Sequence, residues 1–167
     1  MASAAKWEPG SWGRGSKYWE DNVSDISLKN LALGFIAGAI AVATAHEIIN
    51  FILLQAGVFP RVPWSMEPSA VTGVPQIVSD MFWGGVWGIL FVLLYHVIPG
   101  GGPTVKGLIF GIVGPAIVGV FILVPLITGR FPLFFDFDPQ LVGSVLLILA
   151  GFGAAMGWLY GLMSARA

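Results

Sequence analysis

The chain has 167 residues, of which 56% are hydrophobic and 10% are charged, with a formal net charge of −1 and no cysteine. The lack of cysteine excludes disulfides, thiolate metal sites and iron–sulfur clusters. A net charge so close to zero indicates no nucleic-acid partner. Only eight charged residues lie between Leu31 and Met163, and so apolar a stretch predicts a protein embedded in a lipid bilayer.

Residues 1–30 form an N-terminal tail without a long apolar run. The tail contains four aromatic side chains, Trp7, Trp12, Tyr18 and Trp19. Because tryptophan and tyrosine favour the boundary between lipid and water, one interpretation is that these side chains anchor the tail among the lipid headgroups. The alternative is partner docking, in which the tail contacts a neighbouring subunit of a membrane complex.

Four long apolar segments follow, at residues 31–58, 75–98, 104–128 and 141–163. Each can cross the ~30 Å of bilayer hydrocarbon as a helix that rises ~1.5 Å per residue. Barrel strands are excluded because the segments lack polar alternation, and backbone groups in lipid must then be paired within each segment. The sequence therefore predicts an all-α membrane protein in which residues 31–167 form a four-transmembrane-helix bundle.

The distribution of lysine and arginine predicts how this bundle is oriented. Six basic residues belong to the side of the two termini, namely Lys6, Arg14, Lys17, Lys29, Lys106 and Arg166. Two belong to the opposite side, Arg61 and Arg130. Since cytoplasmic segments carry the excess of positive charge, both termini are predicted to be cytoplasmic.

The two loops on the opposite side are rich in proline and aromatic residues. In residues 59–74 prolines prevent a helix, while Trp64 and Met66 offer apolar surface to the membrane interface. In residues 130–139 four phenylalanines are expected to dip into the interface, with Asp136 and Asp138 remaining in water. We expect compact caps that anchor the bundle or contact a partner.

Glycine pairs with four-residue spacing recur along the chain at an offset of 73 residues. The predicted helix-packing residues are Gly34, Gly38, Gly84, Gly88, Gly107, Gly111, Gly157 and Gly161. Such spacing removes side chains from one stripe of a helix and lets two backbones approach closely. The pattern suggests two related helical hairpins, repeated in parallel about an axis along the membrane normal. Within the third segment, Pro115 and Pro125 predict kinks that can open a cavity.

The polar residues His46, Glu47 and Asn50 lie inside the first apolar segment, and Asp80 lies near the start of the second. A carboxylate at such depth costs ~2.5 to 3.5 kcal/mol on insertion scales, so it must be neutral, paired or beside water. His46 and Asn50 share a helix face, with Glu47 about 100° away. Because the second helix runs back, Asp80 is expected at the depth of Asn50, and the four side chains can form one network.

Trp83 and Trp87 follow Asp80 on the same face of the second helix and complete this polar intramembrane cluster. One interpretation is structural: Glu47 or Asp80 accepts a tryptophan N–H, and His46 bonds between helices. The alternative is a proton or ion path, because ionisable residues within a membrane are functional candidates. The equivalent positions of the second half, Gly119, Val120 and Gly153, carry no ionisable group.

The two histidines of the chain, His46 and His96, are expected at different depths, which argues against a haem held by both. His96 is expected near the inner end of its helix, beside Tyr95 and reaching toward the surface. No metal site and no cofactor are predicted. The alternative of a single axial ligand from His46 to a haem or chlorin stays open, since small residues surround it.

Three stretches carry a resemblance to known sequences: Trp64-Ser-Met-Glu-Pro68, then Gly73-Val-Pro75, then Phe82-Trp-Gly-Gly-Val-Trp-Gly88, with His46 upstream. On these the chain resembles a family of uncharacterised small bacterial four-helix membrane proteins, over about residues 31–163 and excluding the tail. The family has no assigned reaction. The resemblance therefore implies a fold and a bacterial inner (cell) membrane location, and no mechanism.

Two classes of function remain open from the sequence. The first is a non-catalytic accessory or structural subunit of a larger membrane complex, respiratory or photosynthetic, with membrane lipids and other membrane subunits as partners. The alternative is a small proton or ion carrier that uses His46, Glu47 and Asp80. No pairing of a nucleophile with a base is evident, so an enzyme is not predicted.

Overall fold

A computed structural model of the chain describes residues 26–70, 72–129 and 133–166. The described residues are helical, apart from turns and one isolated bridge between Pro68 and Pro75. Four helices are long and apolar enough to cross a membrane, and these are Leu28–Gln55, Gln76–Leu94, Pro103–Thr128 and Pro139–Ser164. The predicted all-helical membrane architecture is confirmed. The aromatic side chains Trp7, Trp12, Tyr18 and Trp19 of the tail lie outside the described residues.

The first spanning helix consists of α2 (Leu28–Ala41), the wider π-helical turn η1 (Val42–His46) and α3 (Glu47–Gln55). It begins three residues before the predicted start, because the Ser27 side chain accepts a hydrogen bond from the Asn30 amide and caps the helix. In η1 the amide of Glu47 donates to the carbonyl of Val42, five residues back. Such wide turns often mark functional positions.

The second spanning helix, α4 (Gln76–Leu94), ends four residues before the predicted boundary at Ile98. The amides of Val97 and Ile98 both turn back to the carbonyl of Leu94, so the apolar residues 95–98 form a turn. The first turn of α4 is capped by the preceding loop. The amides of Gln76 and Ile77 donate to the carbonyls of Glu67 and Ser65, which pairs two of the otherwise free N–H groups.

The third spanning helix consists of α5 (Pro103–Gly111), the π-helical segment η2 (Ile112–Leu123) and α6 (Val124–Thr128). Proline lacks an amide hydrogen and its ring crowds the preceding turn. The wide segment accordingly surrounds Pro115, and α6 begins just before Pro125. The predicted distortion at the prolines is therefore present as widened turns.

The fourth spanning helix, α7 (Pro139–Ser164), begins where the Asp138 carboxylate accepts hydrogen bonds from the amides of Gln140 and Leu141. The short turn η3 (Leu133–Phe137) precedes it. Of the four phenylalanines predicted to dip into the interface, Phe134 and Phe135 pack against Phe121 of η2, and Phe131 lies outside the described residues. Phe137 is exposed, as expected of an interfacial side chain.

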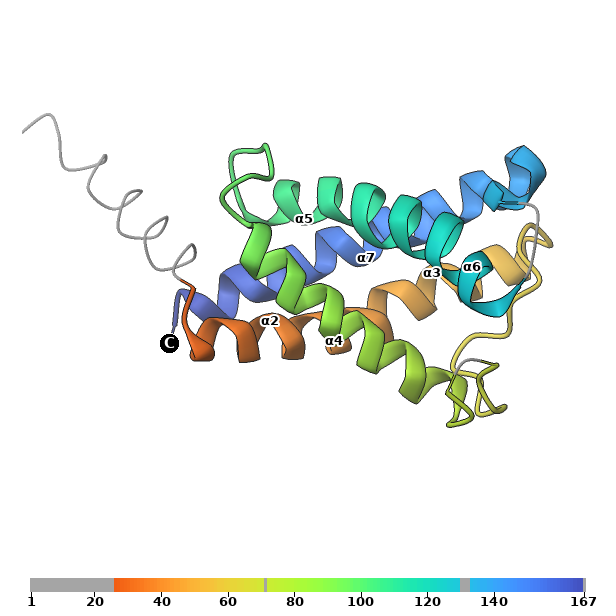
Figure 1. Ribbon diagram of the computed structural model, residues 1–167, viewed down its shortest axis with the longest axis horizontal. Coiled ribbons are helices and arrows are strands. Elements are labelled where there is room, and N and C mark those ends of the chain that lie inside the picture. Colours follow the sequence, from red (N-terminus) through yellow and green to blue (C-terminus); the bar gives the residue numbers. More distant parts are fainter. Residues whose placement is uncertain (1–25, 71, 130–132, 167) are drawn as a thin grey trace, which may run out of the picture.

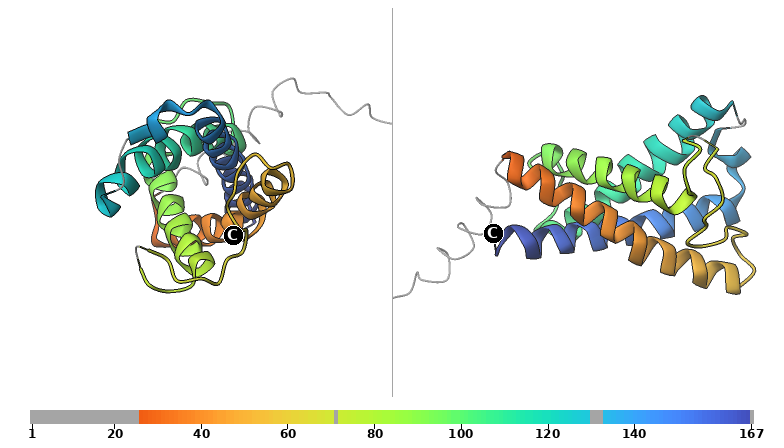
Figure 2. Two further views of the ribbon diagram at one scale, coloured as in Figure 1. Left: turned by 90° about the vertical axis from the view of Figure 1, so that its right-hand side faces the viewer. Right: turned by 90° about the horizontal axis from the view of Figure 1, so that it is seen from below.

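The helices pack as two hairpins, α2 with α4 and α5 with α7, and α2 also packs along α7 (Figure 1). The described ends of the chain and the loop at residues 95–102 lie at one end of the bundle. The loop at residues 56–75 crosses the opposite end, as the view along the bundle shows (Figure 2). We call these the terminal end and the loop end.

Both hairpins bring helix backbones together at glycine. On the first hairpin, a Cβ added to Gly34 would lie 2.6 Å from the carbonyl oxygen of Gly88, and one added to Gly38 would overlap the carbonyl of Gly84. On the second hairpin, Gly107 and Gly111 approach α7 in the same manner, facing Gly153 and Gly157. Gly161 faces the ring of Pro103. The eight predicted glycines thus lie at helix contacts, although the second hairpin is shifted along α7 relative to the pairing that the offset implies.

The terminal half of the bundle is filled by aromatic rings. Phe91 lies at the centre, in edge-to-face contact with Phe110, Tyr95 and Tyr160 at centroid distances of 5.6, 5.5 and 5.9 Å. Phe91 and Tyr160 have no exposed surface. Rings packed in this way exclude water from the space between α4, α5 and α7.

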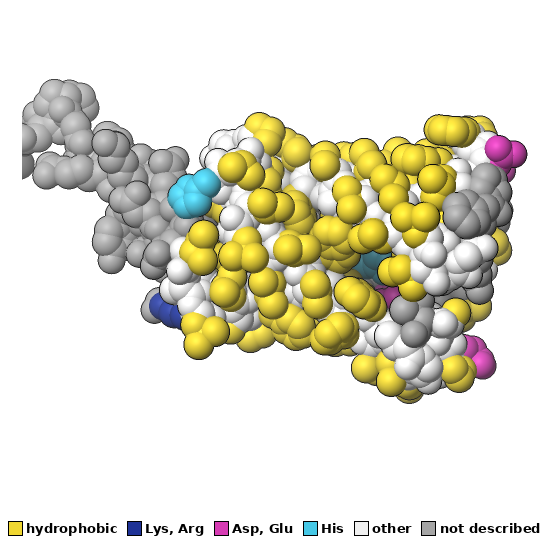
Figure 3. All heavy atoms as spheres, in the orientation of Figure 1, with side chains coloured by type: hydrophobic (Ala, Val, Ile, Leu, Met, Phe, Trp, Pro, Cys, Tyr) yellow, Lys and Arg dark blue, Asp and Glu magenta, His cyan; other side chains and the backbone are white. Residues whose placement is uncertain are grey.

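The face of the bundle drawn in Figure 3 is covered for the most part with apolar side chains. Large exposed side chains occur on every spanning helix, for example Ile52, Val78, Ile127 and Leu147. A continuous apolar surface of this extent is typical of contact with lipid and not of contact with water.

Candidate functional site

A cavity of about 730 Å³ opens between α4 on one side and η2 and α6 on the other, in the half of the bundle nearest the loop end. In Figure 1 these helices separate toward the loop end, and Figure 3 shows a hollow between them with histidine and acidic atoms visible inside. We call this cavity the lateral cleft. It opens through the side of the bundle that carries the apolar lipid-facing surface.

Apolar side chains form most of the lateral cleft. The wall from α4 includes Trp83, Val86, Trp87 and Leu90, and the facing wall includes Pro115, Gly119, Val120, Leu123, Val124 and Ile127. Phe152 of α7 closes the back. The widened turns of η2 position the facing wall, because the space beside Gly119 is filled by the Trp87 ring, 3.0 Å from an added Cβ. The cleft therefore adjoins the widened segment around Pro115, which lines it.

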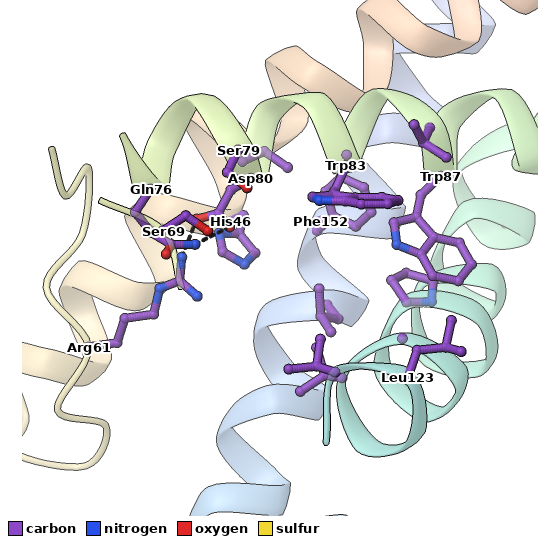
Figure 4. A pocket seen from close by; sticks show the side chains of 18 of the residues that line it. His46, Arg61, Ser69, Gln76, Ser79, Asp80, Trp83, Trp87, Leu123 and Phe152 are labelled. Carbon is purple, nitrogen blue, oxygen red and sulfur yellow. Dashed lines mark hydrogen bonds and ion pairs between the residues drawn. The ribbon is translucent and has the colours of Figure 1, made fainter. Parts of the chain in front are cut away.

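A cluster of polar side chains forms the end of the cleft nearest the loop (Figure 4). Asp80 accepts a hydrogen bond from the guanidinium of Arg61 and a second, of 2.7 Å, from the side-chain amide of Gln76. Arg61 comes from the loop between α3 and α4, which folds back over the membrane helices. Asp80 is 19% exposed and Arg61 34% exposed, so this ion pair lies at the boundary between the bundle and the solvent-facing loop.

Glu47 lies behind this pair and is buried, with 1% of its side chain exposed. Its carboxylate accepts a hydrogen bond of 2.6 Å from the backbone amide of Trp64 and lies 2.8 Å from Nδ1 of His46. The guanidinium of Arg61 is 3.9 Å away. Donors and a positive charge on several sides stabilise the charged form of a carboxylate. An acid is tolerated at this depth because these groups surround it.

His46 connects Glu47 to Asn50, whose side-chain nitrogen lies 3.2 Å from Nδ1 of His46. A ring nitrogen that donates its hydrogen to the Glu47 carboxylate cannot also accept from Asn50. In the described structure the side-chain oxygen of Asn50 is buried without a hydrogen-bond partner. If the Asn50 amide is flipped, this oxygen faces Nδ1 of His46 and can accept its hydrogen, so the contact between His46 and Asn50 becomes a hydrogen bond. The His46 ring itself lines the lateral cleft.

The cluster carries an unbalanced charge. Among the described residues it contains two carboxylates, Glu47 and Asp80, and one guanidinium, Arg61. With a neutral His46 the formal sum is −1. In a site that is largely removed from water, such an imbalance produces a negative potential that extends into the adjoining cleft.

The predicted side chains His46, Glu47, Asn50 and Asp80 thus come together, and Arg61 provides the link between the two acids. A tryptophan N–H does reach an acid, but it is the backbone amide of Trp64 that donates to Glu47, and not an indole of Trp83 or Trp87. The expectation that His46 bonds between helices is wrong, because its described partners Glu47 and Asn50 belong to its own spanning helix. Asp80 is bonded by Arg61 and Gln76, and Glu47 by the amide of Trp64, whose indole N–H donates instead to the carbonyl of Ala43 at 3.0 Å. Trp83 and Trp87 line the apolar part of the cleft.

Three contributors to the cluster are not evident from the sequence: Arg61, Trp64 and Gln76. By sequence alone Arg61 is a loop charge, and Trp64 is interfacial surface. The available signal is composition, since a lone arginine in a loop that adjoins acid-bearing membrane helices is a candidate counter-ion. Gln76 lies one helical turn before Asp80, a spacing at which side chains on one helix meet.

His96 lies far from this cluster, exposed at the terminal end beside Tyr95. The expected separation from His46 is therefore present. Nearby, Lys106 donates to the Tyr95 carbonyl at 2.7 Å and lies 4.3 Å from the centre of its ring. Among the described residues there is no group of three or more histidine, aspartate and glutamate side chains that could hold a metal ion.

The fold and the cleft together define a class: an all-helical membrane protein with a lipid-facing cleft that ends at a charged cluster. Comparison with family models, with curated proteins and with solved structures finds no match for this chain. The resemblance to small bacterial four-helix membrane proteins accordingly stays an expectation from the residues that carry it.

Proposed function

We propose that this protein binds an amphipathic molecule that enters the lateral cleft from the lipid. The observation that carries the proposal is the cleft itself, about 730 Å³ in volume, apolar along most of its walls and polar at one end. Sites for small molecules are typically apolar cavities with a few polar groups that orient the ligand. An apolar body would lie beside Trp87 and Val120, with a polar head beside Asp80 and His46.

The opening supports entry from the bilayer. The rims of the cleft include Val124 and Ile127 of α6 and Trp83 of α4, which are 42%, 66% and 44% exposed on the apolar surface of the bundle. A molecule dissolved in lipid meets this opening without crossing water. The polar cluster lies toward the loop end, where a headgroup would lie at the membrane surface.

The proton or ion carrier is supported less well by the geometry. A carrier needs a polar route or an alternative opening on the other side of the membrane, and intramembrane charges normally mark such a route. Here the ring cluster of Phe91, Phe110 and Tyr160 occupies the terminal half of the bundle. Binding of a molecule that enters the lateral cleft from the lipid accounts for both the closed terminal half and the open cleft.

The role of accessory subunit stays a separate proposal. Its support is in the sequence, in the aromatic tail, and it is compatible with ligand binding by the cleft. Gentle solubilisation followed by native electrophoresis tests it. Migration with a larger complex is the expected result, and migration alone would contradict it.

Native mass spectrometry tests the binding proposal directly. The chain is reconstituted in vesicles of phosphatidylethanolamine and phosphatidylglycerol, extracted in a mild detergent, and compared with Val120→Phe, which fills the cleft. Val118→Phe is the matched control, because Val118 lies in the same segment, is 40% exposed and does not line the cleft. We expect a retained amphipathic molecule in the wild type and in Val118→Phe, and its loss in Val120→Phe. Equal retention in all three would overturn the proposal.

A further inference from the structure

We infer that the lateral cleft selects a lipophilic cation whose charge is diffuse, such as a quaternary ammonium, a phosphonium or a planar aromatic cation. This inference rests on the proposed function, since it names the class of molecule that the cleft would take. Its first support is the charge of the polar end, where Glu47 and Asp80 outnumber Arg61. A negative potential disfavours anionic heads such as phosphate or carboxylate and favours a cation.

The second support is the arrangement of aromatic rings beside the acid. Asp80, Trp83 and Trp87 lie at i, i+3 and i+7 on α4, and the three side chains line one cavity. Figure 4 shows Trp83 and Trp87 projecting from α4 into the space that continues from Asp80 and His46. A cation held within ~6 Å of an indole face is attracted by the negative charge of the ring face, and aromatic sites for quaternary ammonium groups use this attraction.

The third support is the state of the two carboxylates. Both oxygens of Asp80 already accept hydrogen bonds, from Arg61 and Gln76, and those of Glu47 face Trp64 and His46. Each of these oxygens therefore has one of its two lone pairs occupied, whereas a primary amine or a hydrated metal ion gains most from several fully free acceptors. A cation without hydrogen-bond donors requires only a negative electrostatic potential, contact with apolar side chains and the faces of aromatic rings. The polar end offers these three.

The charged and ionisable groups around the head position come from three elements. The first spanning helix contributes His46, α4 contributes Asp80, and the loop contributes Arg61, and all three line the cleft. Glu47 lies behind this lining, 3.9 Å from the guanidinium of Arg61. Among the described lining residues, η2 and α6 contribute none.

The test uses two ions of nearly the same size and shape, tetraphenylphosphonium and tetraphenylborate, which carry opposite charges. Binding of each radiolabelled ion to the purified full chain is measured at pH 8, with Val120→Phe as the reference for binding outside the cleft. We expect cleft-specific binding of the phosphonium at least about tenfold tighter than that of the borate, because the two ions differ by two units of charge and even one unit at close range has an effect of that order.

Variants of the cluster and wall test the two physical causes separately. Asp80→Asn removes one negative charge and is expected to weaken phosphonium binding about tenfold, whereas Asp136→Asn, at an exposed acid outside the cleft, leaves it unchanged. Trp83→Leu is expected to weaken binding about three- to tenfold, with partial recovery in Trp83→Phe. Trp158→Leu is the matched control, because Trp158 is 54% exposed on α7 and does not line the cleft.

The outcomes separate this inference from the proposed function. Cleft-specific binding of the borate as tight as that of the phosphonium overturns the preference for cations and leaves an amphipathic binding site. Binding of both ions that Val120→Phe does not reduce overturns the inference together with the cleft as a binding site. Thermal unfolding of each variant in detergent distinguishes a loss of binding from a loss of fold. A folded Arg61→Gln variant, whose cluster is more negative, should bind the phosphonium more tightly.

Discussion

Arg61 and Asp80 form an ion pair that joins the loop between the first two spanning helices to the start of α4. The same guanidinium is 3.9 Å from Glu47, so one loop residue faces two acids that belong to different membrane helices. The pair also forms the polar end of the lateral cleft. Its strength therefore determines both the position of the loop and the shape of the proposed binding site.

Replacing Arg61 with glutamine should destabilise the protein. The variant leaves two carboxylates without their counter-ion, a change that costs ~3–5 kcal/mol for a fully buried pair. Since Arg61 is 34% exposed, solvent reduces this to an expected loss of about 1–3 kcal/mol in the free energy of unfolding. Thermal and denaturant unfolding in detergent measure it. Lys29→Gln, at an exposed cation outside the cluster, should change stability little, and an equal loss there would contradict a specific role for Arg61.

Replacing Gly38 with alanine should separate α2 from α4. The added methyl group overlaps the backbone carbonyl of Gly84, which cannot move without shifting the helix. We expect a loss of about 1–3 kcal/mol, as for other overpacked contacts. Gly143→Ala is the control on α7, where an added Cβ meets no atom within 4 Å, and the helix preference for alanine should make it neutral or slightly stabilising. Unfolding of the two variants under the same conditions compares them, and equal stabilities would show that this contact does not limit packing.

Replacing Glu47 with glutamine should loosen the loop around Trp64. The Trp64 amide donates to the carboxylate at 2.6 Å, and a neutral side-chain amide offers one oxygen in place of two while directing its own N–H groups at donors. The expected cost is about 1–3 kcal/mol for a buried hydrogen bond to a charged group. Hydrogen–deuterium exchange of the peptide that contains residues 61–66 should become faster by one to two orders of magnitude.

The same measurement on α7 supplies an internal reference for the Glu47→Gln variant. Residues such as Met156 and Tyr160 are buried, and Tyr160 packs against Tyr95 at the terminal end, so their amides should exchange as in the wild type. Faster exchange throughout the chain would indicate general unfolding and would contradict a local role for the bond between Glu47 and Trp64.

The orientation in the membrane can be tested with single cysteines, because the natural chain has none. The positive-inside rule predicts that Glu67, in the loop that crosses the loop end, faces away from the cytoplasm, and that Gly101, at the terminal end, faces the cytoplasm. In intact cells a membrane-impermeant maleimide should label Glu67→Cys and should label Gly101→Cys only after permeabilisation. The reverse pattern would invert the predicted topology and place the polar end of the cleft on the cytoplasmic side.

The number of membrane helices and their approximate bounds follow from the sequence alone. A lipid environment requires each crossing segment to pair its own backbone and to be apolar over about twenty residues, and both properties are local. For the same reason the glycine stripes and the depth of His46, Glu47 and Asn50 are evident from spacing along one helix. Prolines in the third segment likewise indicate a distortion, because the missing amide hydrogen and the crowding by the ring are properties of the residue itself.

The lateral cleft and the pairing of Arg61 with the acids depend on the tertiary structure. Arg61 is 19 residues from Asp80 in sequence, and only the path of a loop without regular structure brings the two together. The Trp64 amide reaches Glu47 by the same path. Val86 and Val120 lie on opposite walls of the cleft, one on α4 and one on η2. Spacing along a helix specifies which side chains share a face, whereas the distance between faces is set by how the helices pack.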